Sequence, residues 1–430
     1  MSLLGICLFT PAIAASVSST VPAKLPVTTK WQPLPVHVDG YLRSYYFTRK
    51  FSNPVLDQQA AFSLGGAVNV LTNPFWDGFR IGATLFTAQS LGLNSDDAIR
   101  LDRSVPGSPV TVLGQAFAQY DNKYVLARVG NQEIITPWEN MADTRMIPAT
   151  YQGVSVDVKP RPDVNLYAMR LNRFKARISS RFTQTNLFNP QNLAFTSIPA
   201  LGNKTDIGTL AFGATYTNPR LNINAWAYRF YNYANLAYAD VNGELDTNTL
   251  FKPIYGLQLA NEWNDGNEVI KSLGLGDTHA QLFGALLGVE IMHGRILFGF
   301  NWLPKHAGAY ENGSIVSPYT TSYMSDPLYT TSMIAGMVEK AAGTAFKVTA
   351  QYIFFAGALE TLASYAKYNT QPYLHDSNET DFDVIFHPPG TFKHLSVRER
   401  LGFLNGNSRY GHYVYNRIML QYDFLEDKAS

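Results

Sequence analysis

The sequence predicts an all-β protein, a transmembrane antiparallel β-barrel with one long loop folded into its interior. Three observations lead to this fold class: repeated segments of alternating side chains, connections that alternate between short and long, and a composition rich in aromatic residues. Of the 430 residues, 13% are aromatic and only 16% are charged. Such a composition is typical of barrels whose lipid-facing band is bordered by aromatic girdles.

The charge and motif content excludes several classes of function. The chain has 34 basic and 33 acidic residues, a net charge of +1, so it lacks the basic excess of a nucleic-acid-binding protein. Its one cysteine, Cys7, provides neither a disulfide framework nor a thiolate metal site. The eight histidines show no metal-ligand spacing, and no nucleophile or phosphate-binding motif appears. We therefore expect no enzyme, metal or cofactor, with a barrel hydrolase as the enzymatic alternative.

The first 35 residues predict an exported chain. Leu3–Ala15 is a short apolar run that ends in small residues, as in a signal peptide, which we assign to residues 1–15. The basic start of such a peptide is missing, and an N-terminal buried strand is the alternative. Residues 16–35 are rich in Ser, Thr and Pro and predict a flexible lead-in. No run of 18 apolar residues follows, so a transmembrane helix is excluded. An exported aromatic-rich chain is then a secreted β-protein or an outer-membrane barrel.

Alternating segments begin at Val36–Phe51, where Val38, Leu42 and Tyr46 share one face and Arg43 and Arg49 the other. Since side chains alternate with period two along a strand, one face suits lipid and the other water. Similar runs occur at 60–70, 79–85, 110–118, 125–129, 164–170, 207–216, 221–228, 280–292, 295–302, 344–355, 394–403 and 413–424. A dozen such runs together are the signature of a transmembrane barrel.

The connections between these runs also sort by length. Short turns are predicted at 73–74, 121–122, 160–162 and 218–219, and long polar loops near 89–108, 131–152, 177–206 and 303–332. Bacterial barrels have short periplasmic turns and long loops on the opposite side. A soluble sandwich would not be expected to sort its loops in this way, and it would bury its apolar face.

The end of the chain predicts the closing strand. Tyr413–Phe424 alternates and finishes on an aromatic residue, which resembles the recognition signal of the outer-membrane assembly machinery. We therefore place a single barrel at residues 36–424, in the bacterial outer membrane, with that machinery, membrane lipid and lipopolysaccharide as partners. Residues 425–430 form a C-terminal tail, and the sequence does not decide whether that tail is native.

The stretch Arg128–Gly153 is polar, has no strand alternation and joins two segments that do alternate. Long loops without structure are uncommon and are usually functional. We predict that this loop folds back into the barrel and narrows it to an opening of the size of a solute. An ordinary surface loop is the alternative.

Several stretches resemble the outer-membrane porin D (OprD) family of substrate-specific porins. LRSYYFTRKF at 42–51 resembles the family's first strand, and TPWENMADTRMIPATYQG at 136–153 resembles its constriction loop. LSVRERLGF and YNRIMLQYDF, at 395–403 and 415–424, resemble its last two strands, and NPFWDGFRIGATLF at 73–86 fits its first turn and third strand. The resemblance implies an 18-stranded monomeric channel for small solutes that bear carboxylates, such as amino acids or organic and aromatic acids.

The family resemblance also implies a column of arginines that guides anions through the pore. The predicted alternation places a substrate-pathway basic ladder on the polar face: Arg43, Arg49, Arg80, Arg128, Arg398, Arg400 and Arg417. Because the first and last strands must pair to close a barrel, residues from both chain ends can form one stripe. Arginine offers a carboxylate a fixed fork of donors. The alternative is that these arginines pair with acids such as Asp39, Asp157 and Asp423.

In the constriction loop, acidic residues are candidates to oppose the ladder, and a rigid segment is expected around them. The predicted constriction residues are Glu133, Pro137, Trp138, Glu139, Asp143, Arg145 and Pro148. Asp143 and Arg145 line the opening in one interpretation and form a local ion pair that pins the loop to the wall in the other. The preferred function is passive diffusion of carboxylates. A channel for neutral oligosaccharides and a structural or adhesive barrel with a blocked lumen are the alternatives.

Overall fold

The computed structural model describes residues 35–106, 109–189, 207–247, 249–266, 269–320, 325–338, 341–370, 376–407 and 411–424. The predicted signal peptide, nearly all of the lead-in and the C-terminal tail lie outside these residues. The described chain forms 18 strands: β1 (Val36–Phe51), β2 (Gln59–Thr72), β3 (Phe79–Gln89), β4 (Val110–Asp121), β5 (Val125–Gln132), β6 (Thr150–Arg161), β7 (Val164–Lys175), β8 (Thr209–Asn218), β9 (Leu221–Phe230), β10 (Ala234–Glu244), β11 (Phe251–Trp263), β12 (His279–Ile291), β13 (Gly294–Leu303), β14 (Gly343–Phe354), β15 (Leu359–Thr370), β16 (Ser377–Phe386), β17 (Leu395–Asn407) and β18 (Gly411–Phe424).

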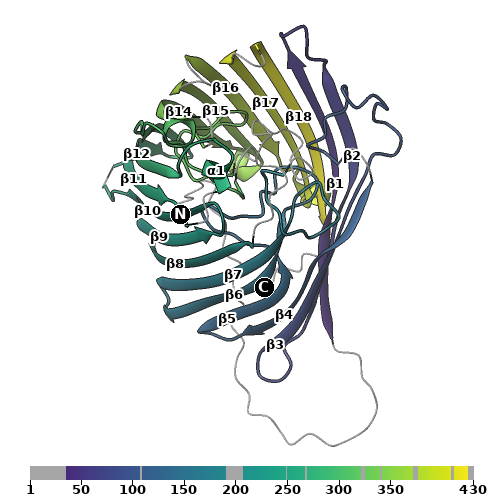
Figure 1. Ribbon diagram of the computed structural model, residues 1–430. Coiled ribbons are helices and arrows are strands. Elements are labelled where there is room, and N and C mark those ends of the chain that lie inside the picture. The colour runs from purple at the N-terminus through teal and green to yellow at the C-terminus, as the bar shows by residue number, and fades with distance from the viewer. Residues whose placement is uncertain are drawn as a thin grey trace, which may run out of the picture.

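Each strand pairs with its neighbours in the sequence, and the sheet closes where β1 pairs with β18. The closing ladder is antiparallel and runs from Gly40 opposite Phe424 to Phe51 opposite Tyr413. Figure 1 shows the strands following one another around a ring, with loop segments in its middle. Closure removes every exposed sheet edge, which a membrane-spanning sheet requires. The predicted 18-stranded antiparallel barrel is therefore confirmed.

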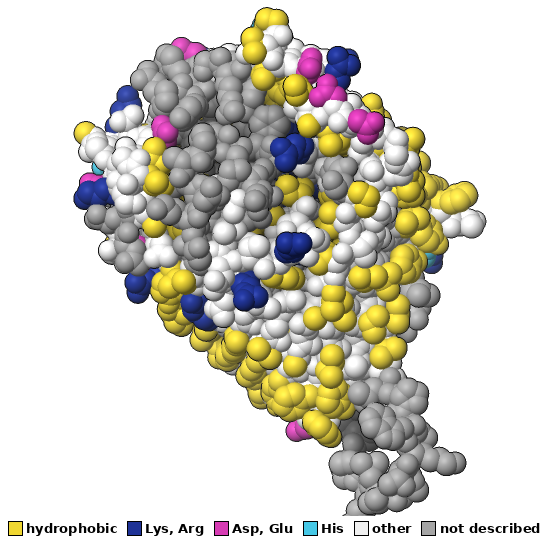
Figure 2. All heavy atoms as spheres, turned by 45° about the vertical axis from the view of Figure 1, so that its right-hand side comes forward, with side chains coloured by type: hydrophobic (Ala, Val, Ile, Leu, Met, Phe, Trp, Pro, Cys, Tyr) yellow, Lys and Arg dark blue, Asp and Glu magenta, His cyan; other side chains and the backbone are white. Residues whose placement is uncertain are grey.

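The alternation predicted for the first strand is present in the structure. On β1, Arg43 and Tyr45 are buried toward the lumen, whereas Leu42 and Tyr46 are 52% and 45% exposed on the outer face. The same pattern recurs on β3, where Ile81 and Leu85 point outward. Figure 2 shows hydrophobic side chains gathered along the flank of the barrel. This flank supplies the apolar surface that contacts lipid.

The connections alternate in length around the ring. Short turns join β2 to β3, β4 to β5, β6 to β7 and β8 to β9, close to the four predicted turns. By the general rule these turns are periplasmic and the long loops extracellular. The longest extracellular connections follow β3, β5, β7, β11 and β13. The strands β6, β10, β11, β15 and β16 were not among the predicted segments.

Extracellular loops fold into the ring, and two of them, named here, concern the site. The connection between β5 and β6, residues 133–149, is termed L3, and the connection between β13 and β14, residues 304–342, is termed L7. Trp138 and Met146 of L3 and Met337 of L7 have no exposed surface. The inward third loop is thus confirmed, although it is shorter than predicted because Gln132 and Tyr151 still pair in the β5–β6 ladder. The inward L7 was not predicted.

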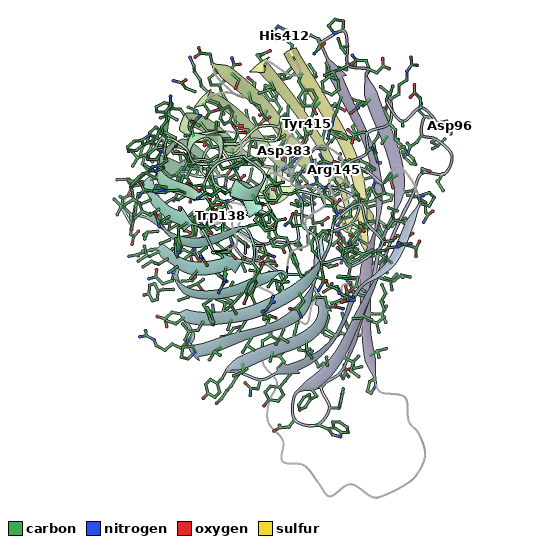
Figure 3. All side chains as sticks on the ribbon, in the orientation of Figure 1. Asp96, Trp138, Arg145, Asp383, His412 and Tyr415 are labelled. Carbon is green, nitrogen blue, oxygen red and sulfur yellow. The ribbon has the colours of Figure 1, made fainter. Side chains whose placement is uncertain are left out.

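The interior of the barrel is packed around aromatic rings rather than filled with polar side chains alone. Tyr151 and Phe174 of the wall contact Tyr319 of L7, with ring centroids 5.8 and 5.4 Å away, and lie 5.2 Å from each other. Figure 3 shows Trp138 and Arg145 inside the outline of the ring, whereas Asp96 and His412 lie at its periphery. In the part of the chain that the structure describes, helical structure is limited to α1 (Val269–Ser272) and short 3-10 turns. None of the described helices has the length and apolar character needed to span a membrane.

Candidate functional site

L3 crosses the lumen, and its first half is attached to the wall formed by β8, β9 and β10. Trp138 is fully buried, its ring meets Tyr238 edge-on at 5.8 Å, and its backbone N–H donates to the Tyr228 hydroxyl at 3.5 Å. The neighbouring Glu139 accepts a hydrogen bond from the Thr209 hydroxyl at 3.2 Å. Aromatic packing and a buried carboxylate therefore fix this half of the loop far from the strands that bear it.

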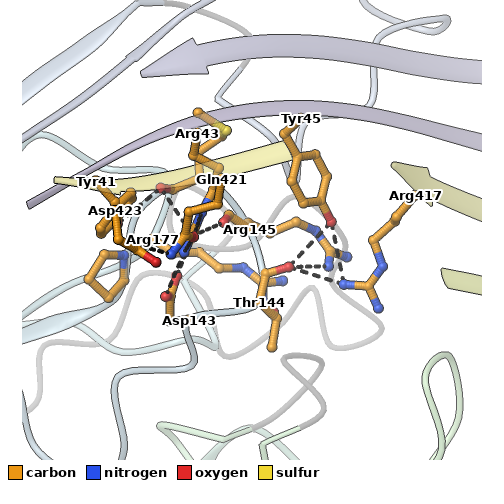
Figure 4. A network of polar contacts seen from close by, with 12 residues as sticks. Tyr41, Arg43, Tyr45, Asp143, Thr144, Arg145, Arg177, Arg417, Gln421 and Asp423 are labelled. Atoms are coloured by element: carbon orange, nitrogen blue, oxygen red, sulfur yellow. Dashed lines mark hydrogen bonds and ion pairs between the residues drawn. The ribbon is translucent and has the colours of Figure 1, made fainter. Parts of the chain in front are cut away.

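The second half of L3 is attached to β1 by an arginine. Arg43 donates to both carboxylate oxygens of Asp143, at 2.7 and 3.0 Å, and its Nη1 also reaches the backbone carbonyls of Arg145 and Met146. Gln421 of β18, directly opposite Arg43 in the closing ladder, accepts from Nε at 2.9 Å. Figure 4 shows this network. A bidentate pair of this kind is both strong and geometrically specific.

A second group of cations converges on Thr144, the next residue of L3. Arg145 and Arg417 each donate Nη1 to the Thr144 carbonyl at 3.0 Å, and the Tyr45 hydroxyl donates to the same oxygen at 3.3 Å. Arg177 donates to the Thr144 hydroxyl at 2.8 Å. These cations belong to three distant parts of the chain and meet at Thr144, as Figure 4 shows.

Two members of this group have no carboxylate partner within the described residues. Arg145 otherwise contacts the Ser104 hydroxyl at 3.2 Å and the face of Phe47, and Arg417 contacts the face of Tyr415. The buried Nε of Arg417 has no hydrogen-bond acceptor in the described chain. An unsatisfied buried donor beside two uncompensated positive charges is suited to an anion.

Other arginines of the predicted ladder do have acidic partners. Arg49 lies 2.6 Å from the buried Asp102 of the β3–β4 loop. Arg398 donates to both oxygens of Asp383 on β16, at 2.8 and 2.6 Å, and Arg400 shares that carboxylate at 2.6 Å. Asp383 thus neutralises one of two charges, and this trio retains a net charge of +1.

The ladder residues on β17 and β18 lie side by side. Arg400 is opposite Arg417 in the β17–β18 ladder, and Arg417 is opposite Phe47 of β1. Arg398 is two residues nearer the periplasmic turn. The structure therefore brings Arg400 and Arg417 together with Arg43 on three adjacent strands of the inner wall.

Arg80 and Arg128 lie apart from this group, on the wall formed by β3, β4 and β5. Gln119 is opposite both of them in register, and Arg128 donates Nε to the Gln119 side chain at 2.6 Å. The guanidinium of Arg128 also lies 4.7 Å from the ring centroid of Phe117. These two arginines form a separate basic patch near the periplasmic turns.

Glu133 begins L3 and has a strongly shifted pKa. Burial raises its pKa to about 7, and the negative charge of Asp143 adds to this rise, while Arg128 and Lys175 oppose it. Its backbone N–H donates to Gln115 at 3.2 Å. Glu133 therefore changes charge near neutral pH at the start of L3.

L7 is held by acids of the wall. Glu379 of β16 accepts the backbone N–H groups of Ile334 and Ala335, at 2.6 and 2.7 Å, and Asp381 accepts that of Met333 at 3.2 Å. Further along L7, Asn301 of β13 accepts the Thr330 N–H at 3.0 Å. Three consecutive backbone donors are thereby captured by two carboxylates two residues apart on one strand.

The structure relates the remaining predicted constriction residues to the wall as follows. Asp143 pairs with Arg43, not with Arg145. The Pro148 carbonyl accepts from the buried Lys175 ammonium at 2.9 Å. Sequence reasoning missed Arg177, Gln421, Asp383 and Glu379. Glu379, Asp381 and Asp383 do share one strand face in the sequence, but β16 itself was not predicted, so that signal went unused.

A closed barrel with an apolar flank and loops that narrow its interior defines a class of protein, the outer-membrane diffusion channel. A family model described as "outer membrane porin, OprD family" matches residues 122–302. No curated relative matches. The family match agrees with the resemblance seen in the sequence.

Solved barrels of Pseudomonas and Acinetobacter share the fold. The chain is similar to Pseudomonas aeruginosa OccK9 (OpdG), at 16% identity and a TM-score of 0.75, with 90% of this chain and 98% of that chain covered. It is also similar to P. aeruginosa OpdK solved with vanillate, at 16% identity and a TM-score of 0.72, with 91% of this chain and 99% of that chain covered. Acinetobacter baumannii OccAB2 is similar at 17% identity and a TM-score of 0.72, with 90% of this chain and 98% of that chain covered. Residues 122–302 thus match the OprD porin family, and the fold of the chain is shared with solved barrels of the bacterial outer membrane.

Proposed function

We propose that this porin selects small solutes bearing a carboxylate and lets them diffuse passively, with Arg145 and Arg417 as the anion-binding step at L3. The supporting observation is the pair of uncompensated guanidinium groups that share the Thr144 carbonyl. A carboxylate entering beside Thr144 would replace this shared carbonyl as their acceptor and would satisfy the Arg417 Nε. Such a site orients the carboxylate through directed hydrogen bonds and also attracts it by charge.

The remaining ladder residues extend this step toward the periplasm. Arg398 and Arg400 with Asp383 keep a net charge of +1, so they attract an anion without holding it as tightly as two free cations would. Weak successive sites favour flux, because a solute must bind well enough to enter and weakly enough to leave. The structural neighbour solved with vanillate, an aromatic carboxylate, supports this class of solute by analogy of fold.

A neutral-sugar pathway has less support. Trp226, Tyr228 and Phe230 of β9 form a stacked row inside the barrel, with centroids 5.4–5.6 Å apart, which is the arrangement that could bind sugar rings. However, these rings are only 5%, 3% and 1% exposed, because L3 and other residues cover them. Covered rings offer no face to a passing solute.

The test is single-channel recording in a planar bilayer. For the wild-type chain we expect anion preference, with current block on adding benzoate or glutamate. Arg417→Gln should lower the anion/cation permeability ratio by about threefold to tenfold, because one charge at a few ångströms changes an ion's energy by on the order of 1 kcal/mol after screening. Arg417→Lys, which keeps the charge, should retain most of the selectivity.

A matched control is Arg161→Gln, which removes an exposed arginine paired with Asp163 at a periplasmic turn. It should leave selectivity unchanged. Equal selectivity of the wild type and Arg417→Gln would overturn the proposed anion step. Block by oligosaccharides that is insensitive to Arg417→Gln would support the sugar pathway, and absence of current would support a blocked barrel.

A further inference from the structure

The outer face of β8–β12 has an apolar groove with a volume of about 740 Å³. Its floor consists of small side chains that adjoin one another in register: Ala225 and Ala227 of β9 and Ala237 and Ala239 of β10. Phe212, Leu259 and Phe283 rise on either side of this floor. The groove is thus an elongated depression in the outer surface, about one side chain deep. Its volume is within the range of ligand pockets.

The groove faces the bilayer, not the lumen. Phe212 and Leu259 are both 54% exposed, whereas the alternate residues Trp226 and Tyr238 are buried inside the barrel. Lipid is therefore the medium that fills the groove. A wall of exposed alanines between larger side chains lets an acyl chain lie closer to the backbone than elsewhere on the barrel.

Two arginines stand immediately above the groove on the extracellular side. Arg170 of β7 and Arg229 of β9 are both opposite Leu210 of β8. These three residues form a row of outward side chains, and the next outward row toward the periplasm contains Phe212 and Ala227 of the groove. Their guanidinium carbons lie 4.5 and 4.9 Å from the ring centroid of Tyr231. A shared aromatic ring thus positions two positive charges at the boundary between lipid and water.

Neither arginine has a carboxylate partner among the described residues. Arg170 bonds only the carbonyls of Leu171 and Thr209, through Nη1, and Arg229 bonds only the Asp265 carbonyl, at 3.4 Å. The nearby Asp265 carboxylate accepts the Asn232 N–H at 2.7 Å. The two positive charges therefore retain donors for an external anion.

We propose that the groove with Arg170 and Arg229 is a binding site for an outer-leaflet lipid whose headgroup bears phosphate and whose acyl chains fill the alanine floor. The two guanidinium groups flank one aromatic ring and offer donors to the phosphorylated headgroup, and the groove below receives a chain attached to the same headgroup. The order along the membrane normal, charge above and apolar groove below, matches such a lipid and fits no soluble anion.

A second copy of this chain is a poorer occupant. In a two-fold dimer about an axis along the membrane normal, each outward row faces the same row of the partner. The Arg170–Arg229 row would then face its own copy, and like charges would oppose association. Charge complementarity thus favours a phosphorylated lipid.

The experiment titrates the detergent-purified protein with bisphosphorylated lipid A and with its fully dephosphorylated form, and measures bound lipid by native mass spectrometry. The wild type should bind the phosphorylated form at least tenfold more tightly, the change expected for a charge-assisted hydrogen bond. Arg170→Gln/Arg229→Gln should abolish this preference. Ala227→Leu/Ala237→Leu, which fills the groove, should weaken binding of both forms.

The control Arg161→Gln/Arg220→Gln removes two exposed arginines at periplasmic turns and should bind like the wild type. Heat-modifiable migration on gels verifies that each variant is folded. Single-channel conductance should also be unchanged, because Arg170, Arg229, Ala227 and Ala237 all face away from the lumen. Equal lipid preference in Arg170→Gln/Arg229→Gln overturns the proposal. Dimers in light scattering that Ala227→Leu/Ala237→Leu dissociates would instead assign the groove to a second copy.

Discussion

The two inserted loops are attached to the wall at clusters of opposite charge, arginines for L3 and carboxylates for L7. At L3, the wall donates: Arg43 and Arg417 reach the Asp143 carboxylate and the Thr144 carbonyl of the loop. At L7, wall carboxylates accept: Glu379 and Asp381 receive the backbone N–H groups of residues 333–335. Tyr368 and Lys347 of the wall add donors to L7 backbone carbonyls. The lumen therefore has a basic side at β1, β17 and β18 and an acidic side at β16, and the loops lie between them.

This difference has a consequence for the sequence of each loop. L3 depends on a particular side chain, because only an acid at position 143 can form the bidentate pair with Arg43. L7 is held through its backbone, so the identities of Met333, Ile334 and Ala335 matter little for these bonds as long as none is proline. A family motif can therefore reveal L3, whereas L7 leaves no comparable mark in the sequence.

The largest effect is expected from breaking the L3 attachment. Arg43→Met should leave the Asp143 carboxylate without its partner and destabilise the loop by roughly 3 kcal/mol, the lower end for a buried pair, because Asp143 is partly exposed. Single-channel recordings should then show larger and noisier currents. Asp143→Asn combined with Arg43→Met should cost much less than the sum of the single changes. Additive losses in the midpoint of heat-modifiable migration would contradict the pairing.

Breaking the L7 attachment should have a smaller effect. Glu379→Gln keeps one acceptor oxygen but turns an N–H₂ group toward a backbone N–H, at a cost of about 1–3 kcal/mol. Hydrogen exchange at Ile334 and Ala335 should become faster, while exchange in L3 should not change. Ile334→Ala, by contrast, should preserve slow exchange. Faster exchange in Ile334→Ala would show that its side chain, not Glu379, holds the loop. Glu360→Gln, at an exposed site, serves as the control.

A pH dependence separates the two loops further. Because the pKa of Glu133 is raised to about 7, this carboxyl is neutral below pH 7 and negative above it. Anion permeability should therefore decrease as the pH rises from 6 to 8, when one negative charge appears beside Arg128, Lys175 and Asp143. Glu133→Gln should remove this step and keep the higher permeability at pH 8. A step of the same size in Glu133→Gln, measured by reversal potential, would show that another group titrates.

The sequence predicted the parts of the fold that depend on local alternation and missed those that do not. β1 and β18 have clear outward apolar and inward polar faces, so both were found. β15 was missed because its alternation is reversed: the inward side chains include the apolar Ala366 and Tyr368, and the outward ones include the charged Lys367. A simple barrel strand has polar side chains inward and apolar side chains toward lipid. Such inversions arise where inserted loops make part of the lumen apolar.

At the site, the alternation could place arginines on the inner face but could not give their partners. Arg43 and Asp143 are 100 residues apart, and Arg398 meets Asp383 only because β16 and β17 are neighbours. Pairing across strands depends on register, which requires the strands themselves to be known. The residues that retain uncompensated charge, Arg145 and Arg417, could therefore be distinguished only in the structure.

The smallest effect concerns the trio on β16 and β17, where the basic and acidic sides of the lumen meet. Arg398→Gln leaves Arg400 paired with Asp383 and changes the local charge from +1 to 0, so anion permeability should fall by only about twofold, since this site is more exposed and better screened than Thr144. Asp383→Asn should change permeability in the opposite direction, because it raises the local charge to +2. Both effects should diminish in 1 M salt. If Arg398→Gln lowered anion permeability as much as Arg417→Gln does, the selective step would lie at the trio. The difference between the attachments of the two loops would then not determine selectivity.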